Sequence, residues 1–261
     1  FDAKIYENRV YDGTGKPDPS VELVYGPNIV PWPAMEPLAE DILLYVASEI
    51  HDPVTTTDEL IPSGETSSYR SNPMGLAEFK LSSKDPAYVG EAKKARAFEE
   101  TRIAGNLAGE TDGSLRAALD AFAEIDGFDA EKTEIGSTIY AVKPGDGSAR
   151  EQAASCQRVL GGAANICREF ATKRYRSNCI NWGIVPFTIA PDTPFEYKPG
   201  DFVFVKGLRE AILNGDEEID AQVITAEGET HPIHLFFQNL TPAERDILAD
   251  GCLMNYYKNR K

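Results

Sequence analysis

The sequence predicts an α/β domain in which helices flank a mixed β-sheet. Short runs of β-branched and aromatic residues, such as 42–47 and 138–142, are typical of buried strands. Residues 85–127 instead carry apolar side chains at helical spacing. Near the carboxyl end, two alternating runs at 218–225 and 229–237 are joined by a short turn, which predicts an antiparallel hairpin. Strands connected by helices, together with a hairpin, indicate a mixed sheet.

The remaining elements follow from the same reasoning. We expect strands at 164–170, 184–189 and 200–206, and helices at 150–160, 171–182, 208–213 and 241–257. Gly183 should end the helix before it, and Pro186 favours an edge position for its strand because it lacks an N–H donor. Thr241 followed by Pro242 predicts the N-cap and first residue of the closing helix.

The chain is predicted to have two parts. Residues 1–40 are rich in Pro, Gly and turn formers, which indicates an extended lead-in or linker from preceding domains. The domain proper is expected to span residues 41–261, with a helical insertion at about 85–135. The acidic stretch 124–134 is typical of a solvated face or loop. Because the chain opens on Phe1 without a Met, we expect a piece of a longer chain or a processed product.

Charge and hydropathy exclude several classes of partner. The 261 residues carry a net charge of −16, which repels nucleic acid and anionic lipid. No apolar run approaches the roughly 18 residues of a membrane span, and no signal-peptide pattern is found. We therefore expect a cytoplasmic protein with neither nucleic-acid nor membrane partners. A small anionic substrate remains compatible with this charge if arginines converge locally.

The cysteine pattern does not encode a metal site. Cys156, Cys167, Cys179 and Cys252 include no C-x-x-C spacing, so neither a zinc site nor an iron–sulfur cluster is expected in this chain. Reduced and mostly buried thiols are the expected state.

The candidate chemistry concentrates at 143–154, where a strand runs into a glycine-bounded turn and then a helix. Ser148-Ala149-Arg150-Glu151 fits a capping box, in which the Ser148 hydroxyl would accept from the Glu151 amide. The start of a helix is also a common anion site. The two roles are compatible and the local pattern leaves both open. The sequence is neither a dinucleotide fingerprint nor a serine-hydrolase elbow.

Two polar loops add further candidates. Asp58 lies in the loop at 55–64, and Arg70 lies in the next polar segment, at 67–73. Long polar loops within a compact domain are more often functional than idle. The alternatives are a cap or turn role for Asp58 and a solvated side chain for Arg70.

These segments, in this order, resemble the C-terminal swivelling domain (domain 4) of the aconitase-family hydratases. Thr56-Thr57-Asp58 with the later Arg70 is similar to the family's T-T-D-H-I-S block and its following Y-R-G-H. Residues 145–154, Gly-Asp-Gly-Ser-Ala-Arg-Glu-Gln-Ala-Ala, resemble G-x-G-S-S-R-[ED]-x-A-A. Residues 160–187 resemble the family's L-G-G block and the following G-x-L-P-L.

The resemblance implies a layered β/β/α swivelling domain and a set of site residues. Ser148 would be the base that removes a proton from the substrate carbon, with helix amides and the adjacent guanidinium stabilising its alkoxide. Arg70 and Arg150 would bind substrate carboxylates, and Asp58 would belong to the active-site shell. Ala149 occupies the position of the family's second motif serine, which helps to shape the substrate site.

The resemblance also implies a cofactor and partners outside this chain. The family's hydro-lyases use a [4Fe-4S] cluster held by three cysteines in other domains. Those cluster-bearing domains of the same longer chain, and a small hydroxy di- or tricarboxylate, are the expected partners. Alone, the chain should be an inactive fragment. The alternatives are the small subunit of an isopropylmalate-isomerase-type enzyme or, because of Ala149, a catalytically degenerate binding module. Arg174 and its neighbours replace the family's R-I-H block, so the substrate stays open.

Overall fold

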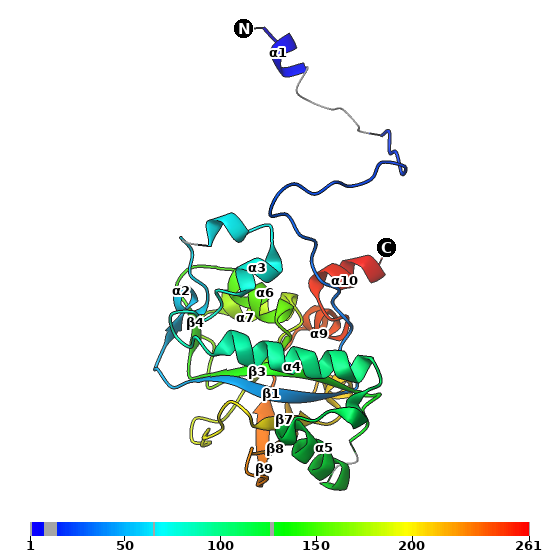
Figure 1. Cartoon of the computed structure of the whole chain (residues 1–261). Coiled ribbons are helices and arrows are strands. Elements are labelled where there is room, and N and C mark those ends of the chain that lie inside the picture. The colour runs from blue at the N-terminus through cyan, green and yellow to red at the C-terminus, as the bar shows by residue number, and fades with distance from the viewer. Residues whose placement is uncertain (1, 8–14, 65, 126–127, 261) are drawn as a thin grey trace.

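The computed structural model describes residues 2–7, 15–64, 66–125 and 128–260. Residues 8–14, within the expected lead-in, and 126–127, at the end of the expected helical stretch, lie outside these ranges. Helix α1 spans Lys4–Glu7. Between residues 15 and 40 the described chain forms no helix or strand; its first part extends away from the body of the molecule, whereas from about residue 30 it lies against the body (Figure 1).

Seven strands close into a barrel that has a parallel and an antiparallel half. They are β1 (Asp41–Ile50), β3 (Thr133–Ala141), β5 (Gly162–Cys167), β6 (Val185–Thr188), β7 (Phe202–Val205), β8 (Glu218–Ile224) and β9 (Thr230–Phe236). The order around the barrel is β1-β3-β5-β6-β9-β8-β7. Neighbours from β1 to β6 are parallel, whereas the pairs that involve β7, β8 or β9 are antiparallel. The predicted α/β class with a mixed sheet is confirmed, as is the hairpin.

The prediction that Pro186 marks an edge strand is wrong. Strand β6 lies between β5 and β9, with Pro186 opposite Asn165 of β5. Strand β9 joins β6 only through Thr188 and Phe236, beyond the proline. The missing N–H of Pro186 is therefore not required for that contact, and the strand can be interior.

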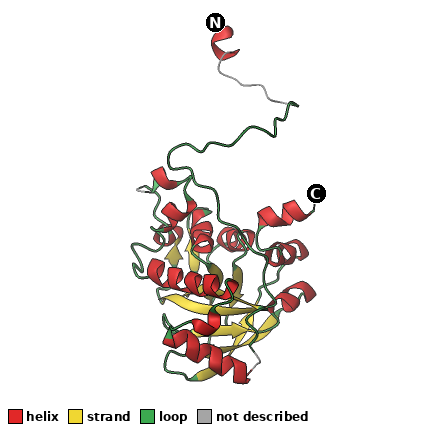
Figure 2. Ribbon diagram, turned by 45° about the vertical axis from the view of Figure 1, so that its right-hand side comes forward, coloured by secondary structure: helices red, strands yellow, loops and turns green. Residues whose placement is uncertain are grey.

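Most helices gather on one side of the barrel, as Figures 1 and 2 show. After α1, the helices of the described chain are α2 (Thr57–Leu60), α3 (Pro73–Ala77), α4 (Tyr88–Ile103), α5 (Gly113–Ile125), α6 (Gln152–Val159), α7 (Lys173–Asn181), α8 (Leu208–Asn214), α9 (Pro242–Ala249) and α10 (Leu253–Asn259). Two short 3-10 turns span Ser67–Tyr69 and Leu107–Gly109. Helix α4 packs across β1 and β3. In the described ranges, no helix combines the length and apolar character needed to cross a bilayer.

Strand β1 separates two hydrophobic cores. Leu43 and Tyr45 point into the core beneath α4, where the rings of Tyr45 and Phe98 lie 6.1 Å apart. Ile42 and Leu44 point into the second core, which includes residues of β5 to β9. Because both faces of β1 are covered by a hydrophobic core, its sequence is a continuous apolar run and does not alternate between apolar and polar residues.

The closing helix is broken, which the sequence did not predict. Thr241 forms the expected N-cap, with a capping box to Glu244. Helix α9 then ends at Ala249, and α10 begins at Leu253. Gly251 between them has a φ of +87°, and a Cβ there would clash with the Glu36 carbonyl oxygen. The break therefore seats the lead-in segment against the helix pair.

Gly251→Ala should destabilise the fold by more than about 3 kcal/mol, because a left-handed φ and a backbone clash add. Gly228→Ala is the matched control, since Gly228 has a φ of +86° and a Cβ added there would meet no atom within 4 Å. That change should cost only about 1 kcal/mol. Denaturant unfolding measures both, and equal losses would contradict the role of the Glu36 contact.

Candidate functional site

The candidate site forms where two neighbouring parallel strands end. Strands β1 and β3 are paired and parallel, so the loops after them leave from the same edge of the barrel. A short parallel pair of β2 (Thr55–Thr56) with β4 (Pro144–Asp146) then holds these two loops together. The arrangement places Asp58 beside the 145–150 turn.

Ser148 does not cap a helix, so the predicted capping box is wrong. Helix α6 begins later than expected, with Glu151 as its N-cap and no side-chain cap bond. Gly147, with a φ of +88°, extends the turn before it. The Ser148 carbonyl accepts from Thr57 Oγ1 at 2.9 Å and from the Arg150 amide at 2.9 Å. The Ser148 side chain is exposed, and its hydroxyl bonds to no described residue.

A third loop, at the start of α7, supports the same turn. Thr172 Oγ1 donates to the Gly145 carbonyl at 2.9 Å, and Arg174 Nη2 donates to the Gly147 carbonyl at 3.1 Å. Gly145 has a φ of +90°, and a Cβ there would clash with the Tyr175 ring. Only glycine fits this position, because the turn presses directly on α7.

Arg150 is held by groups from the loop after β1. Its Nη1 pairs with the Asp58 carboxylate and donates to the Ile61 carbonyl at 3.1 Å. The Arg150 side chain is 19% exposed, whereas Asp58 is 65% exposed. The carboxylate therefore reaches Arg150 from the solvent side, where water weakens the pair.

Arg70 and Arg150 line the same cleft. Its volume is about 270 Å³, and its walls are Ile61, Pro62, Ser63, Thr66, Arg70, Leu76, Arg150 and Gln152. The exposed Arg70 forms no hydrogen bond or ion pair with a described residue. Asp58, Ser148 and the exposed Ala149 adjoin Arg150 but do not line the cleft. The structure thus brings the two arginines to one cleft, with the serine on the turn beside it.

Sequence reasoning missed Lys80, which lies behind this cleft. Its side chain is completely buried, and its Nζ donates to the Ala153 carbonyl at 2.8 Å, in the first turn of α6. Burial lowers the pKa of Lys80 to about 8. Its position between Phe79 and Leu81 is the only local hint of burial in the sequence.

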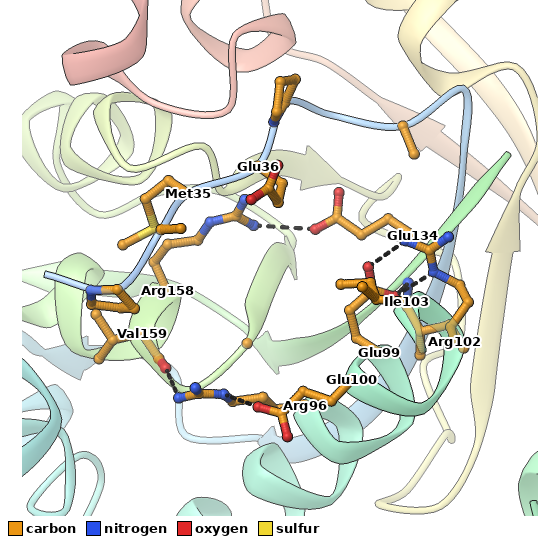
Figure 3. A pocket seen from close by; sticks show the side chains of 16 residues that line it. Met35, Glu36, Arg96, Glu99, Glu100, Arg102, Ile103, Glu134, Arg158 and Val159 are labelled. Atoms are coloured by element: carbon orange, nitrogen blue, oxygen red, sulfur yellow. Dashed lines mark hydrogen bonds and ion pairs between the residues drawn. The ribbon is translucent and has the colours of Figure 1, made fainter. Parts of the chain in front are cut away.

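A larger cavity, of about 540 Å³, lies at the opposite end of α6 (Figure 3). Its arginines are paired with glutamates: Arg96 with Glu100, Arg102 with Glu99, and Arg158 with Glu134. Glu134 was expected in a solvated stretch, but its side chain is only 14% exposed and burial raises its pKa. Two of these pairs lie within α4 and the third joins α6 to β3, while residues 33–37 and 39 of the lead-in line the cavity, so we interpret it as a junction between structural elements.

The cysteines of this chain do not fit an iron–sulfur cluster. Cys156, Cys167, Cys179 and Cys252 are free and buried. Burial raises the pKa of both Cys156 and Cys179 to about 12, which disfavours the thiolate that a metal requires. No group of three or more potential metal ligands occurs among the described residues.

Comparison with known proteins matches residues 94–192 to the aconitase C-terminal domain. The matched region contains the 145–150 turn but neither Asp58 nor Arg70. The methanogen homoaconitase small subunit of Methanocaldococcus jannaschii is 34% identical over 152 residues, which cover 58% of this chain and 79% of that protein. The chain belongs to the aconitase C-terminal domain family.

Relatives of two sizes share this domain. The 3-isopropylmalate dehydratase small subunit of Metallosphaera sedula is 33% identical over 49% of this chain and 69% of its own length. The mitochondrial homocitrate dehydratase of Saccharomyces cerevisiae is 26% identical over 94% of this chain, but only 29% of its own length is covered. This aconitase-family chain therefore spans most of a small subunit and under a third of the longer dehydratase.

Thr57→Val should destabilise the fold by about 1–2 kcal/mol, because it removes the buried hydroxyl that binds the Ser148 carbonyl. Amide exchange at residues 147–150 should accelerate as the turn loosens. Thr101→Val is the control, since the Thr101 hydroxyl also donates to a carbonyl but on an exposed helix surface. Unchanged exchange at 147–150 in Thr57→Val would contradict the proposed contact between the loops.

Proposed function

We propose that this chain is the swivelling domain of an iron–sulfur-dependent hydro-lyase that dehydrates and rehydrates a hydroxy di- or tricarboxylate. The observation that carries the proposal is the convergence of Arg70 and Arg150 on one cleft beside the exposed Ser148. Family membership supports the reaction class, since relatives are named as dehydratases and hydratases. The barrel with its helical cover would correspond to the β/β/α swivelling domain.

The residues would divide the work as follows. Arg70 and Arg150 bind two substrate carboxylates, and bidentate pairs with guanidinium fix the position of the reacting carbon. Ser148 removes the proton from that carbon. Asp58 orients Arg150 through their ion pair. Ala149 leaves the place of a second hydroxyl empty, which favours a substrate other than citrate.

The cluster would come from outside this chain. We propose that a large subunit, or domains of the same longer chain, holds the [4Fe-4S] cluster and closes over the cleft, in a cytoplasmic enzyme. The small-subunit relatives favour a separate partner, because this chain covers most of their length. We also propose that residues 1–40 are a linker from preceding domains and that residues 41–261 form the swivelling domain. By itself, the chain should show no turnover.

Ser148→Ala should lower turnover at least about 100-fold in the enzyme assembled with its cluster-bearing part, as expected for loss of a general base. The free energy of unfolding should change by less than about 0.5 kcal/mol, because the hydroxyl caps no helix. Ser83→Ala, at another exposed serine, is the control. Unchanged turnover in Ser148→Ala would rule out the base assignment.

Arg70→Met should raise the KM for a di- or tricarboxylate by about 10- to 100-fold, because it removes a charge-assisted carboxylate bond. Folding should be unaffected, since Arg70 is exposed and unpaired among the described residues. Arg116→Met is the control, because Arg116 lies on α5 away from the cleft and its guanidinium donates to the Ala108 carbonyl. Equal KM values for the two variants would argue against carboxylate binding by Arg70.

A further inference from the structure

Lys80 is buried with little to stabilise its charge. Its side chain has no solvent exposure, and the Ala153 carbonyl is its one hydrogen-bond acceptor among the described residues. The backbone at Lys80 is fixed as well, because the Lys80 amide donates to the Ala77 carbonyl and the Leu81 amide donates to the Leu60 carbonyl. A buried ammonium with a single neutral partner is costly, so the position calls for an explanation beyond packing.

Lys80 lies close to the cleft that Arg70 and Arg150 line. The Ala153 amide donates to the Arg150 carbonyl at 3.1 Å, so the residue that Lys80 contacts is bonded directly to the candidate arginine. Gln152 of α6 and Leu76 of α3 line the cleft, and these two helices pack together. Lys80 therefore lies directly behind the wall formed by α3 and α6.

No opposite charge surrounds Lys80 among the described residues. The titratable groups whose charge acts on it are Cys156 of α6 and Cys179 of α7. Burial raises the pKa of both thiols to about 12, so both are neutral at physiological pH. Lys80 forms no ion pair with a described residue. Its positive charge is thus uncompensated and acts on the cleft through a medium of low dielectric constant.

Burial of the Lys80 ammonium lowers the stability of the fold at neutral pH. Burial holds the pKa of Lys80 at about 8, below the ordinary value of 10.5. The folded state therefore disfavours the ammonium, and stability should rise as the pH increases from about 8 towards the unfolded pKa. At neutral pH the charge destabilises the fold. A charged residue that lowers the stability of the fold at neutral pH is better explained by a role in the site than by a role in core packing.

From these contacts we propose that Lys80 is a positioning residue for the carboxylate cleft. Its ammonium fixes the first turn of α6 behind Arg150 and adds positive charge there, so carboxylate binding weakens when Lys80 loses its proton. This inference rests on the proposed function, because it presumes that the cleft binds carboxylates.

Citrate serves as the test probe, and calorimetry on this chain measures its binding at pH 7.5 and 9.5. The unaltered chain should lose about three- to tenfold in affinity between the two pH values. Lys80→Met should bind citrate at both pH values with the weaker affinity that the unaltered chain shows at pH 9.5. It should also melt at the same or a higher temperature, because a buried charge is replaced by an apolar side chain of similar length. Lys93→Met, at an exposed lysine of α4, should behave as the unaltered chain.

A second measurement needs no variant. Titrations of the unaltered chain at pH 8.2 in two buffers of different ionisation enthalpy report proton uptake, which should be on the order of 0.3 proton per citrate. Absence of uptake, or Lys80→Met binding with the affinity and pH dependence of the unaltered chain, would overturn the role of Lys80 and leave the cleft intact. If citrate fails to bind the unaltered chain at pH 7.5, this inference is overturned, whereas the proposed function is judged separately by the turnover of Ser148→Ala and the KM of Arg70→Met in the assembled enzyme.

Discussion

The parallel pairing of β1 with β3 extends over nine residue pairs, from Asp41 with Thr133 to Ile50 with Ala141. Because the pairing continues to the carboxyl ends, the two following loops must leave side by side, and the β2–β4 pair continues their contact. A slip of one residue would exchange the two faces of each strand, moving core side chains to the wrong side. The two hydrophobic cores therefore fix the register, and the register fixes the candidate site.

The candidate site gathers the cationic side chains of Arg70, Arg150 and Lys80 within a chain of net charge −16. Arg150 is balanced by Asp58, but that carboxylate is 65% exposed, so a ligand carboxylate can replace it at small cost. Lys80 has no carboxylate partner among the described residues, so its charge, present below a pH of about 8, has no counter-ion to exchange. The counter-ion of Arg150 is thus exchangeable whereas Lys80 has none, which would suit the proposed binding and release of a carboxylate.

The sequence predicted those parts of the fold that depend on local pattern. The apolar run of β1, the helix α4 and the hairpin of β8 with β9 are confirmed. Two errors arose where distant contacts decide the backbone: Gly251 breaks the last helix against Glu36, and left-handed Gly147 delays the helix that Ser148 was expected to cap. The family resemblance placed Asp58 and Arg70 with the 145–150 turn, which no local pattern could. Lys80 escaped prediction because its burial depends on how α3 and α6 pack.

The position of Ser148 limits how it can act as a base. Helix α6 begins only at Gln152, so the helix amides do not point at the Ser148 hydroxyl and cannot stabilise an alkoxide there. The nearest cation in sequence is Arg150, whose Nη1 is already engaged by Asp58 and Ile61. If Ser148 is the proposed base, stabilisation of its alkoxide would therefore come from the remaining donors of Arg150 and from groups that the proposed cluster-bearing part would supply. The proposed chemistry of the serine and the proposed need for a partner would thus follow from the same backbone geometry.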